Sequence, residues 1–338
     1  MPIPSWHSRL QEVAPNVFAY IHSGVGWDIC NSGFIVGDDG VLVIDAMMVA
    51  SQVRLYMEEI RKVTDKPIRY VVNTHHHVDH SFGNQFYLPA EIVSHRGCRE
   101  SLTTRGADVG MLSERSPQYK EDWAEARLTP ASITYEDKMI VHLGGKVVEL
   151  LHPGPAHTYG DTMVYLPQEK VLFSGDVAFH YLTPLARDGH VSNWIKITNG
   201  ILNHLDVTTL MPGHGPVSDK EAVGKTLKYL RLVKRTSRLH FDRGSSAEET
   251  CRAIRLGGAV RVGLSGESGR FDFDANGPRE DEERRVPPGS GSKNDLAGVI
   301  PTQAHIVAEN VAKSQPWGEP LFIDVPKGRD AAQAIDLG

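Results

Sequence analysis

Short apolar runs separated by turn residues recur through the first two thirds of the chain, and they predict two series of β-strands. The second series begins near Met139 and ends with the strand that precedes Met211. Helical stretches accompany both series, which favours two sheets packed together with helices outside them. The predicted strands of the first series are 17–21, 34–36, 41–44 and 68–72, and those of the second include 147–151, 163–166 and 171–173.

Two helical stretches stand out beside these strands. One covers about 50–63, within the first series. The other runs over about 219–239 and carries Val223, Leu230 and Val233 at a spacing close to 3.6 residues per turn. An apolar stripe of this kind is typical of a helix that packs on the outer face of a sheet.

The composition of the chain changes after about residue 240. Residues 266–294 are rich in Gly, Ser, Asp, Glu and Arg, which favours an exposed or flexible linker. We therefore predict one large domain over residues 1–240 and a C-terminal extension over 241–338. The extension would comprise a short helix, this linker, and a tail that docks on the domain or on a second subunit.

Candidate metal chemistry begins directly after the run 68–72, in the segment Thr-His-His-His-Val-Asp-His at 74–80. In an extended chain His75 and His77 face the same side, while Asp79 and His80 reach a second position once the chain turns. One peptide can thus serve two adjacent metal ions. The alternative is a polar loop that caps a strand, which four ligand-type side chains in six residues make a poor explanation.

Further ligand-type residues follow other apolar strands, at the carboxyl ends where open α/β sheets place their sites. His157 comes after 147–151, Asp176 after 171–175 and His214 after 209–213. Each has an ordinary alternative when taken alone: a turn residue, a helix N-cap or a surface histidine. Their joint occurrence favours a metal site.

In this order, these residues and Asp45 resemble the metallo-β-lactamase superfamily of binuclear metallohydrolases, over about residues 14–235. The motif at 154–167 is similar to its lactamase-like and general hydrolase branches. The resemblance implies an α/β fold, a four-layer αββα sandwich. It also implies that His75, His77 and His157 hold one metal ion, that Asp79, His80 and His214 hold the other, and that Asp176 bridges both.

The implied activity is hydrolysis by a hydroxide that two metal ions share, which attacks the carbonyl of a small amide, lactam, lactone or ester. Asp79 would both bind metal and accept a hydrogen bond from the attacking oxygen. Two Zn²⁺ ions are expected, although Mn²⁺, Fe²⁺ or Co²⁺ suit the same ligands. The alternatives are an acyl-thioester hydrolase, an iron-dependent oxidoreductase of the same fold, and a binding protein whose site is inactive.

Other residues receive supporting roles. The family places Asp45 behind the metal ions, where it holds a ligand histidine or the cluster loop by hydrogen bonds, although Asp45 could also cap the helix at 50–63. Trp27 in a glycine-containing loop, with Phe179 and His180, would form an apolar or aromatic substrate pocket. Tyr181 would donate a hydrogen bond to the developing oxyanion. Lactamases of the most similar motif type carry a cysteine at Asp176 and a lysine at Phe179, so a penicillin-type substrate is not expected.

Composition changes this picture little. The net charge of −6 gives no overall electrostatic reason to bind nucleic acid or an anionic membrane. No run approaches the about 18 apolar residues of a membrane helix, and the first residues lack a basic segment followed by an apolar one. We expect a cytoplasmic enzyme with a small-molecule substrate, with a homo-oligomer possible through the extension. Three widely spaced cysteines argue against a disulfide framework.

Overall fold

The computed structural model describes residues 6–23, 29–105, 109–246 and 249–250. Trp27 and almost all of the extension at 241–338 lie outside the described residues, so what we predict for them stays a prediction. The elements are β1 (Arg9–Ala14), β2 (Val17–Ile21), β3 (Ser32–Gly37), β4 (Gly40–Ile44), α1 (Ala50–Val63), β5 (Ile68–Val72), α2 (Val78–Ser81), the 3₁₀ helix η1 (Phe82–Tyr87), β6 (Glu91–His95), α3 (Arg96–Arg105), α4 (Val109–Arg115), the 3₁₀ helix η2 (Pro117–Tyr119), α5 (Lys120–Ala124), β7 (Ile133–Tyr135), β8 (Lys138–His142), β9 (Val147–Leu151), β10 (Met163–Leu166), β11 (Val171–Phe179), α6 (Val191–His204), β12 (Thr209–His214) and α7 (Lys220–Asp242).

The strands form two mixed sheets. The first has seven strands in the order β1-β2-β3-β4-β5-β6-β7. Its neighbours are antiparallel from β1 to β4 and parallel from β4 to β7. The second sheet has the order β12-β11-β10-β9-β8, with only the β11–β12 pair parallel. The parallel strands bring the carboxyl ends of β4, β5, β11 and β12 to the same side of the domain.

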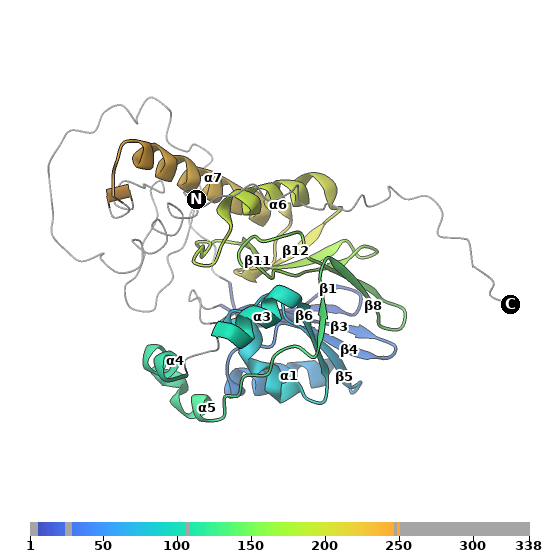
Figure 1. Ribbon diagram of the computed structural model, residues 1–338. Coiled ribbons are helices and arrows are strands. Elements are labelled where there is room, and N and C mark those ends of the chain that lie inside the picture. The colour runs from blue at the N-terminus through green and yellow to red at the C-terminus, as the bar shows by residue number, and fades with distance from the viewer. Residues whose placement is uncertain (1–5, 24–28, 106–108, 247–248, 251–338) are drawn as a thin grey trace.

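Figure 1 shows α1 below the first sheet and α6 and α7 above the second. Strand β4 explains this layering, because its side chains alternate between two cores. Leu42 and Ile44 pack between the sheets, whereas Val41 and Val43 pack with Tyr56 of α1 on the outer face. A strand covered on both faces is apolar throughout, as the run 41–44 is. The predicted four-layer αββα sandwich is confirmed.

The outer layer over the second sheet is also amphipathic. Trp194 and Ile197 of α6 and Val223 and Leu230 of α7 are buried against it. The structure adds β1, β6 and β7 to the strands that the apolar runs predict. Strand β1, at the sheet edge, has no buried residue, which explains why it lacks the apolar pattern of the others. Among the described residues, no helix combines the length and apolar character that crossing a membrane requires.

Candidate metal centre

The histidine-rich loop takes its shape from the end of β5. The chain bends at residues 74–77 after β5, and His77, with an extended backbone (φ −61°, ψ 147°), is the N-cap of α2, so the chain is helical after it. This change places the imidazoles of His75 and His77 on one side and Asp79 with His80 on another. Asn73 fixes the start of the loop through two amide–amide hydrogen bonds with Asn84, of 2.9 and 2.8 Å.

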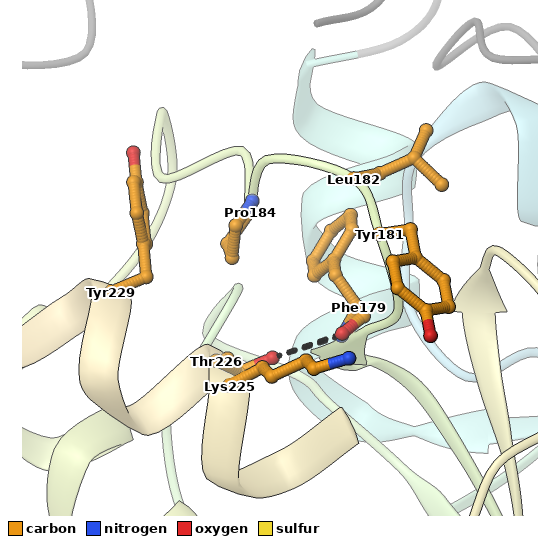
Figure 2. A pocket seen from close by; sticks show the side chains of 7 residues that line it. All are labelled: Phe179, Tyr181, Leu182, Pro184, Lys225, Thr226 and Tyr229. Atoms are coloured by element: carbon orange, nitrogen blue, oxygen red, sulfur yellow. Dashed lines mark hydrogen bonds between the residues drawn. The ribbon is translucent and has the colours of Figure 1, made fainter. Parts of the chain in front are cut away.

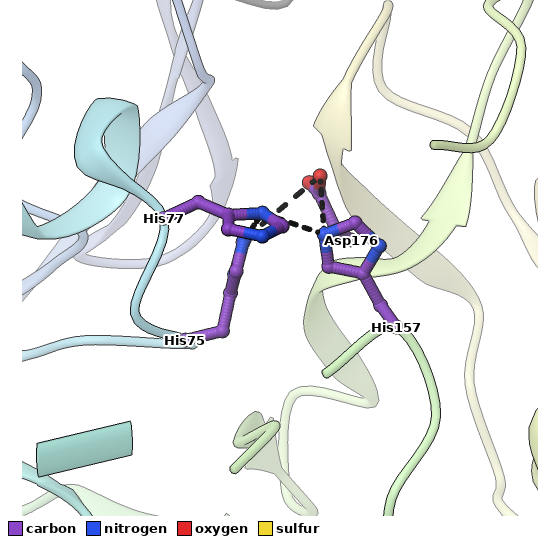
Figure 3. A group of neighbouring side chains, drawn as sticks. All are labelled: His75, His77, His157 and Asp176. Carbon is purple, nitrogen blue, oxygen red and sulfur yellow. Dashed lines mark hydrogen bonds and ion pairs between the residues drawn. The ribbon is translucent and has the colours of Figure 1, made fainter. Parts of the chain in front are cut away.

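Three imidazoles and one carboxylate form the first ligand group: His75, His77, His157 and Asp176 (Figure 3). The Nδ1 atom of His77 lies 3.0 Å from Nε2 of His75 and 3.0 Å from Nε2 of His157. Asp176 Oδ2 lies 3.3 Å from His157 Nε2 and 4.0 Å from His75 Nε2. All four residues are buried.

These contacts fit a cation better than they fit hydrogen bonds among the side chains. An imidazole nitrogen has a single in-plane lone pair, so His77 Nδ1 cannot accept well from His75 and His157 together. Four ligands at about 2.0–2.1 Å from a tetrahedral Zn²⁺ are separated from each other by about 3.3 Å. The observed separations lie around this value, so the donor set fits a tetrahedral metal ion.

The second ligand group consists of Asp79, His80, His214 and again Asp176. Asp79 Oδ2 lies 3.1 Å from His80 Nε2 and 3.3 Å from His214 Nε2. Asp176 Oδ1 lies 3.4 Å from His80 Nε2 and 3.5 Å from His214 Nε2. Asp79 Oδ2, His80 Nε2 and Asp176 Oδ1 are buried and make no hydrogen bond within the described part of the chain. Buried polar atoms need a partner, and a shared cation would supply one.

Asp176 connects the groups, because its Oδ2 faces the first and its Oδ1 faces the second. Its neighbour across the β11–β12 pair must be glycine. A Cβ atom on Gly213 would lie only 1.9 Å from Asp176 Oδ1. The residue before His214 therefore has no side chain because the carboxylate occupies that space.

Burial and charge set the protonation of these groups. Burial lowers the pKa of His157 to about 3, which leaves its nitrogen available to a metal ion. Burial alone would raise the pKa of Asp176, but His214, His80 and His157 hold it at about 2. Burial would lower the pKa of His214, but the carboxylates of Asp176 and Asp79 raise it to about 9. A proton on His214 would therefore compete with a cation in the second group.

Asp45 lies behind both groups. Its Oδ2 accepts hydrogen bonds from His80 Nδ1 and from the Thr74 hydroxyl, both 2.8 Å long, and its Oδ1 accepts from the Thr74 amide at 2.7 Å. The Thr74 hydroxyl in turn accepts from His75 Nδ1 at 3.1 Å. A carboxylate that fixes a ligand imidazole in this way orients it toward its metal ion. Asp45 does not cap α1, because Val49 occupies the N-cap position.

The loop around His157 depends on Asp161. Its carboxylate accepts hydrogen bonds from the Ala156 amide and from the amide and hydroxyl of Thr158. Burial raises the pKa of Asp161 to about 7, although these donors lower it. Behind this loop His152 donates to the Asp161 carbonyl at 2.7 Å and stacks on His95 at 3.7 Å between ring centroids.

Three further residues support the site and were not identified from the sequence. The Asn31 side chain donates to the carbonyls of Pro212 and Gly215, on either side of His214. Cys30 donates to the Asp79 carbonyl at 2.9 Å. His77 contacts Asp188, which is 111 positions away in the chain. No local pattern could reveal such contacts, because each joins segments that only the fold brings together.

The proposed pocket residues lie along the end of β11. Phe179 is buried and packs against two ligands, edge-on to His157 and parallel to His214. His180 stacks on Tyr181 and donates to the Pro216 carbonyl. Figure 2 shows Tyr181 beside Lys225, whose ammonium lies 4.1 Å from the centre of the ring. Trp6 stacks on the same ring, so Tyr181 is held by groups outside the two ligand groups.

The known proteins that this chain resembles include two that it matches over part of their length. The chain is 28% identical over 221 residues to the 2,4-dinitroanisole O-demethylase subunit alpha of Nocardioides sp. (strain JS1661), a match that covers 63% of the chain and 60% of that protein. It is 26% identical over 235 residues to the linear primary-alkylsulfatase of Pseudomonas sp. (strain ATCC 19151), covering 58% of the chain and 44% of that protein. The chain thus spans about half the length of these curated relatives.

Solved structures support the fold. The inverting sec-alkylsulfatase Pisa1 of Pseudomonas sp. superposes with a TM-score of 0.63 at 18% identity, covering 92% of this chain and 52% of that one. At this identity the likeness concerns the fold alone. The model of the Metallo-beta-lactamase superfamily matches residues 25–230, which include all seven residues of the two ligand groups. Because that match covers more than half of the sequence, the chain belongs to the metallo-beta-lactamase superfamily.

Proposed function

We propose that this chain is a hydrolase that uses two metal ions to cleave a small amide, lactam, lactone or ester with an apolar or aromatic substituent. One observation carries the proposal: seven buried side chains form two ligand groups that share the two oxygens of Asp176. Bridged sites of this kind bind pairs of ions.

Zinc is the first choice for both ions, because neutral imidazole and ionised carboxylate are ordinary zinc ligands. The same ligands also accept manganese, iron or cobalt. When bound, such a pair lowers the pKa of a shared water and polarises the bond to be cleaved. His75, His77 and His157 would hold one ion, Asp79, His80 and His214 the other, and Asp176 both.

Asp79 has a second proposed role as acceptor of a hydrogen bond from the attacking oxygen. Burial would raise its pKa, but His80 and His214 hold the pKa of Asp79 well below its usual range. The carboxylate is thus ionised at neutral pH and can accept a hydrogen bond. Tyr181 is the proposed donor to the developing oxyanion, on the grounds that it follows the strand that delivers Asp176. A Tyr181→Phe variant tests that role, with a fall in kcat as the expected result.

A second candidate substrate class follows from the relatives. One is named for O-demethylation of 2,4-dinitroanisole and the other for cleavage of primary alkyl sulfates. Neither substrate contains a carbonyl at the cleaved bond. An aryl ether or an alkyl sulfate therefore joins the lactone, lactam and ester as a candidate, with the acyl thioester as a further alternative.

The test is a panel with one substrate of each class, followed by mass spectrometry on metal-replete protein in ¹⁸O-labelled water. Incorporation of label into a product shows hydrolysis and identifies the cleaved bond. A chelator should abolish turnover, and added Zn²⁺ should restore it. His157→Ala should abolish it as well, whereas His142→Ala, which removes an exposed histidine on β8, should not. Turnover that survives both chelation and His157→Ala would refute the proposal.

A further inference from the structure

Asp188 lies against a proposed metal ligand from outside the two ligand groups. Its Oδ2 is 2.9 Å from Nε2 of His77, and the side chains of His77 and Asp188 are only 10% and 11% exposed. The other ring nitrogen of His77, Nδ1, is the atom that approaches His75 and His157. The two nitrogens of one imidazole therefore face different partners.

This arrangement selects one form of the His77 ring. An ionised carboxylate only accepts hydrogen bonds, so His77 Nε2 must carry the proton that joins it to Asp188. In the neutral ring Nδ1 then has a lone pair, directed at the first ligand group. The carboxylate also makes Nδ1 a stronger donor to a cation and limits rotation of the ring.

The second ligand group contains a matching pair with the ring reversed. Asp45 accepts from Nδ1 of His80, and His80 Nε2 then faces Asp79 and Asp176. Each group thus has one imidazole backed directly by a carboxylate. The sequence predicted this role for Asp45. Asp188, which the sequence did not single out, is its counterpart in the first group.

Asp188 belongs to the connection between β11 and α6, and this connection is tied to the His157 loop. The His190 amide donates to the Ala156 carbonyl at 2.8 Å, and the Gly189 amide donates to Ala186 at 3.2 Å. The same connection therefore reaches His77 through Asp188 and His157 through Ala156. Both histidines belong to the first ligand group.

We propose that Asp188 is a positioning residue for the first metal ion, one that fixes the tautomer and orientation of His77. The inference rests on the proposed metal centre. It predicts that loss of Asp188 lowers the affinity for the ion held by His75, His77 and His157. The affinity for the ion held by Asp79, His80 and His214 should not change.

The experiment is ¹¹³Cd NMR of full-length protein loaded with cadmium, because the two groups differ in nitrogen and oxygen donors. His77→Ala and His214→Ala assign the two resonances. In Asp188→Ala the first ion should bind about 10- to 100-fold more weakly. Asp188→Asn, whose side-chain carbonyl still accepts a hydrogen bond from His77 Nε2, should lose less affinity for the first ion than Asp188→Ala. Asp206→Ala, which removes an exposed carboxylate that pairs with Lys170 away from both ligand groups, should change neither ion.

A second readout separates positioning from general loss of structure. In cadmium-loaded wild type the Nε2 proton of His77 should give a downfield, slowly exchanging signal that disappears in Asp188→Ala and survives in Asp188→Asn. If Asp188→Ala weakened the binding of both ions equally, or left the binding of both unchanged, the inference would be overturned. If the wild type binds no cadmium at the first group, the proposed metal centre itself fails.

Discussion

The two ligand groups differ in their donors and in their surroundings. The first offers three imidazole nitrogens and one carboxylate oxygen, whereas the second offers two of each. The imidazole that Asp45 backs is fully buried in the second group. The one that Asp188 backs in the first group is 10% exposed and depends on the segment that connects β11 to α6.

This difference predicts distinct behaviour for two sites only one carboxylate apart. The second group brings more negative charge, so it suits harder ions. Its backing pair, His80 and Asp45, is also more deeply buried than His77 and Asp188. The nitrogen-rich first group favours zinc, and its geometry depends on the segment between β11 and α6. The experiments that follow test this contrast, from the largest expected effect to the smallest.

Replacing Asp176 by Ala should remove the contrast altogether, because both groups lose an oxygen at once. Two-metal catalysis is worth several kcal/mol, so activity should fall on the order of 1000-fold. Cadmium titration should show that the affinities for both ions fall together. A variant that loses only one ion would contradict the bridging role of Asp176.

Gly213→Ala should affect the second group before the first, because its Cβ would collide with Asp176 Oδ1. We expect loss of the second ion and about 1–3 kcal/mol of folding free energy, as for other overpacked sites. Denaturant unfolding and cadmium NMR measure the two effects. Gly224→Ala is the matched control, since a Cβ at Gly224 meets nothing within 4 Å. Equal behaviour of the two variants would refute the steric argument.

Asp45→Ala should weaken the second ion more than the first, because Asp45 bonds His80 directly and His75 only through Thr74. We expect about 10- to 100-fold weaker binding of the second ion. The buried Thr74 amide also loses its acceptor, which costs about 1–3 kcal/mol of stability. Isothermal titration with Zn²⁺ and thermal unfolding test both. If Asp45→Ala lost the first ion preferentially, Asp45 would not be the support of the second group.

Low pH should lower the folding stability through His95, which stacks on His152 behind the His157 loop of the first group. Burial, and then the neighbouring His152, lower the pKa of His95 to about 3 from its ordinary value of 6.5. The unfolded chain takes up a proton at His95 before the folded chain does, so stability should fall as pH falls from 6.5 toward 3.

The test compares denaturant unfolding of chelated protein at pH 7 and pH 5. Asn at position 95 keeps an acceptor for the Gly97 amide and removes the titrating ring. His95→Asn should therefore lose less stability than wild type between the two pH values. An identical loss would show that His95 contributes nothing to the acid sensitivity.

The sequence predicted the buried frame better than its edges. Apolar runs identified β4 and β5 because both faces of these strands are covered, and they missed β1 because none of its residues is buried. The helix predicted at 50–63 has the observed bounds. The predicted metal ligands share one local rule, since each comes at or after the end of an apolar run, and the structure brings all seven together. Strand β11 extends beyond its apolar run 171–173, so Asp176 lies within the strand rather than after it.

Residues that act on the ligands from behind follow no such rule. Asn31 reaches carbonyls more than 180 positions away, and Asp188 lies in a connection whose own sequence indicates no partner. Tyr181 and Phe179 were placed by their order in the chain, which does not determine which way a ring points at the end of a strand. The Tyr181→Phe variant described above tests the role proposed for Tyr181.

The origin of the ligands has a consequence for how the domain assembles. Each group takes two side chains from the first half of the domain and two from the second: His75 and His77 with His157 and Asp176, and Asp79 and His80 with Asp176 and His214. Neither half can build a site alone. Metal ions would then act as cross-links that form only after the two sheets dock, so binding favours the docked state by mass action. Separately expressed halves of this domain should reassemble more tightly when metal is present.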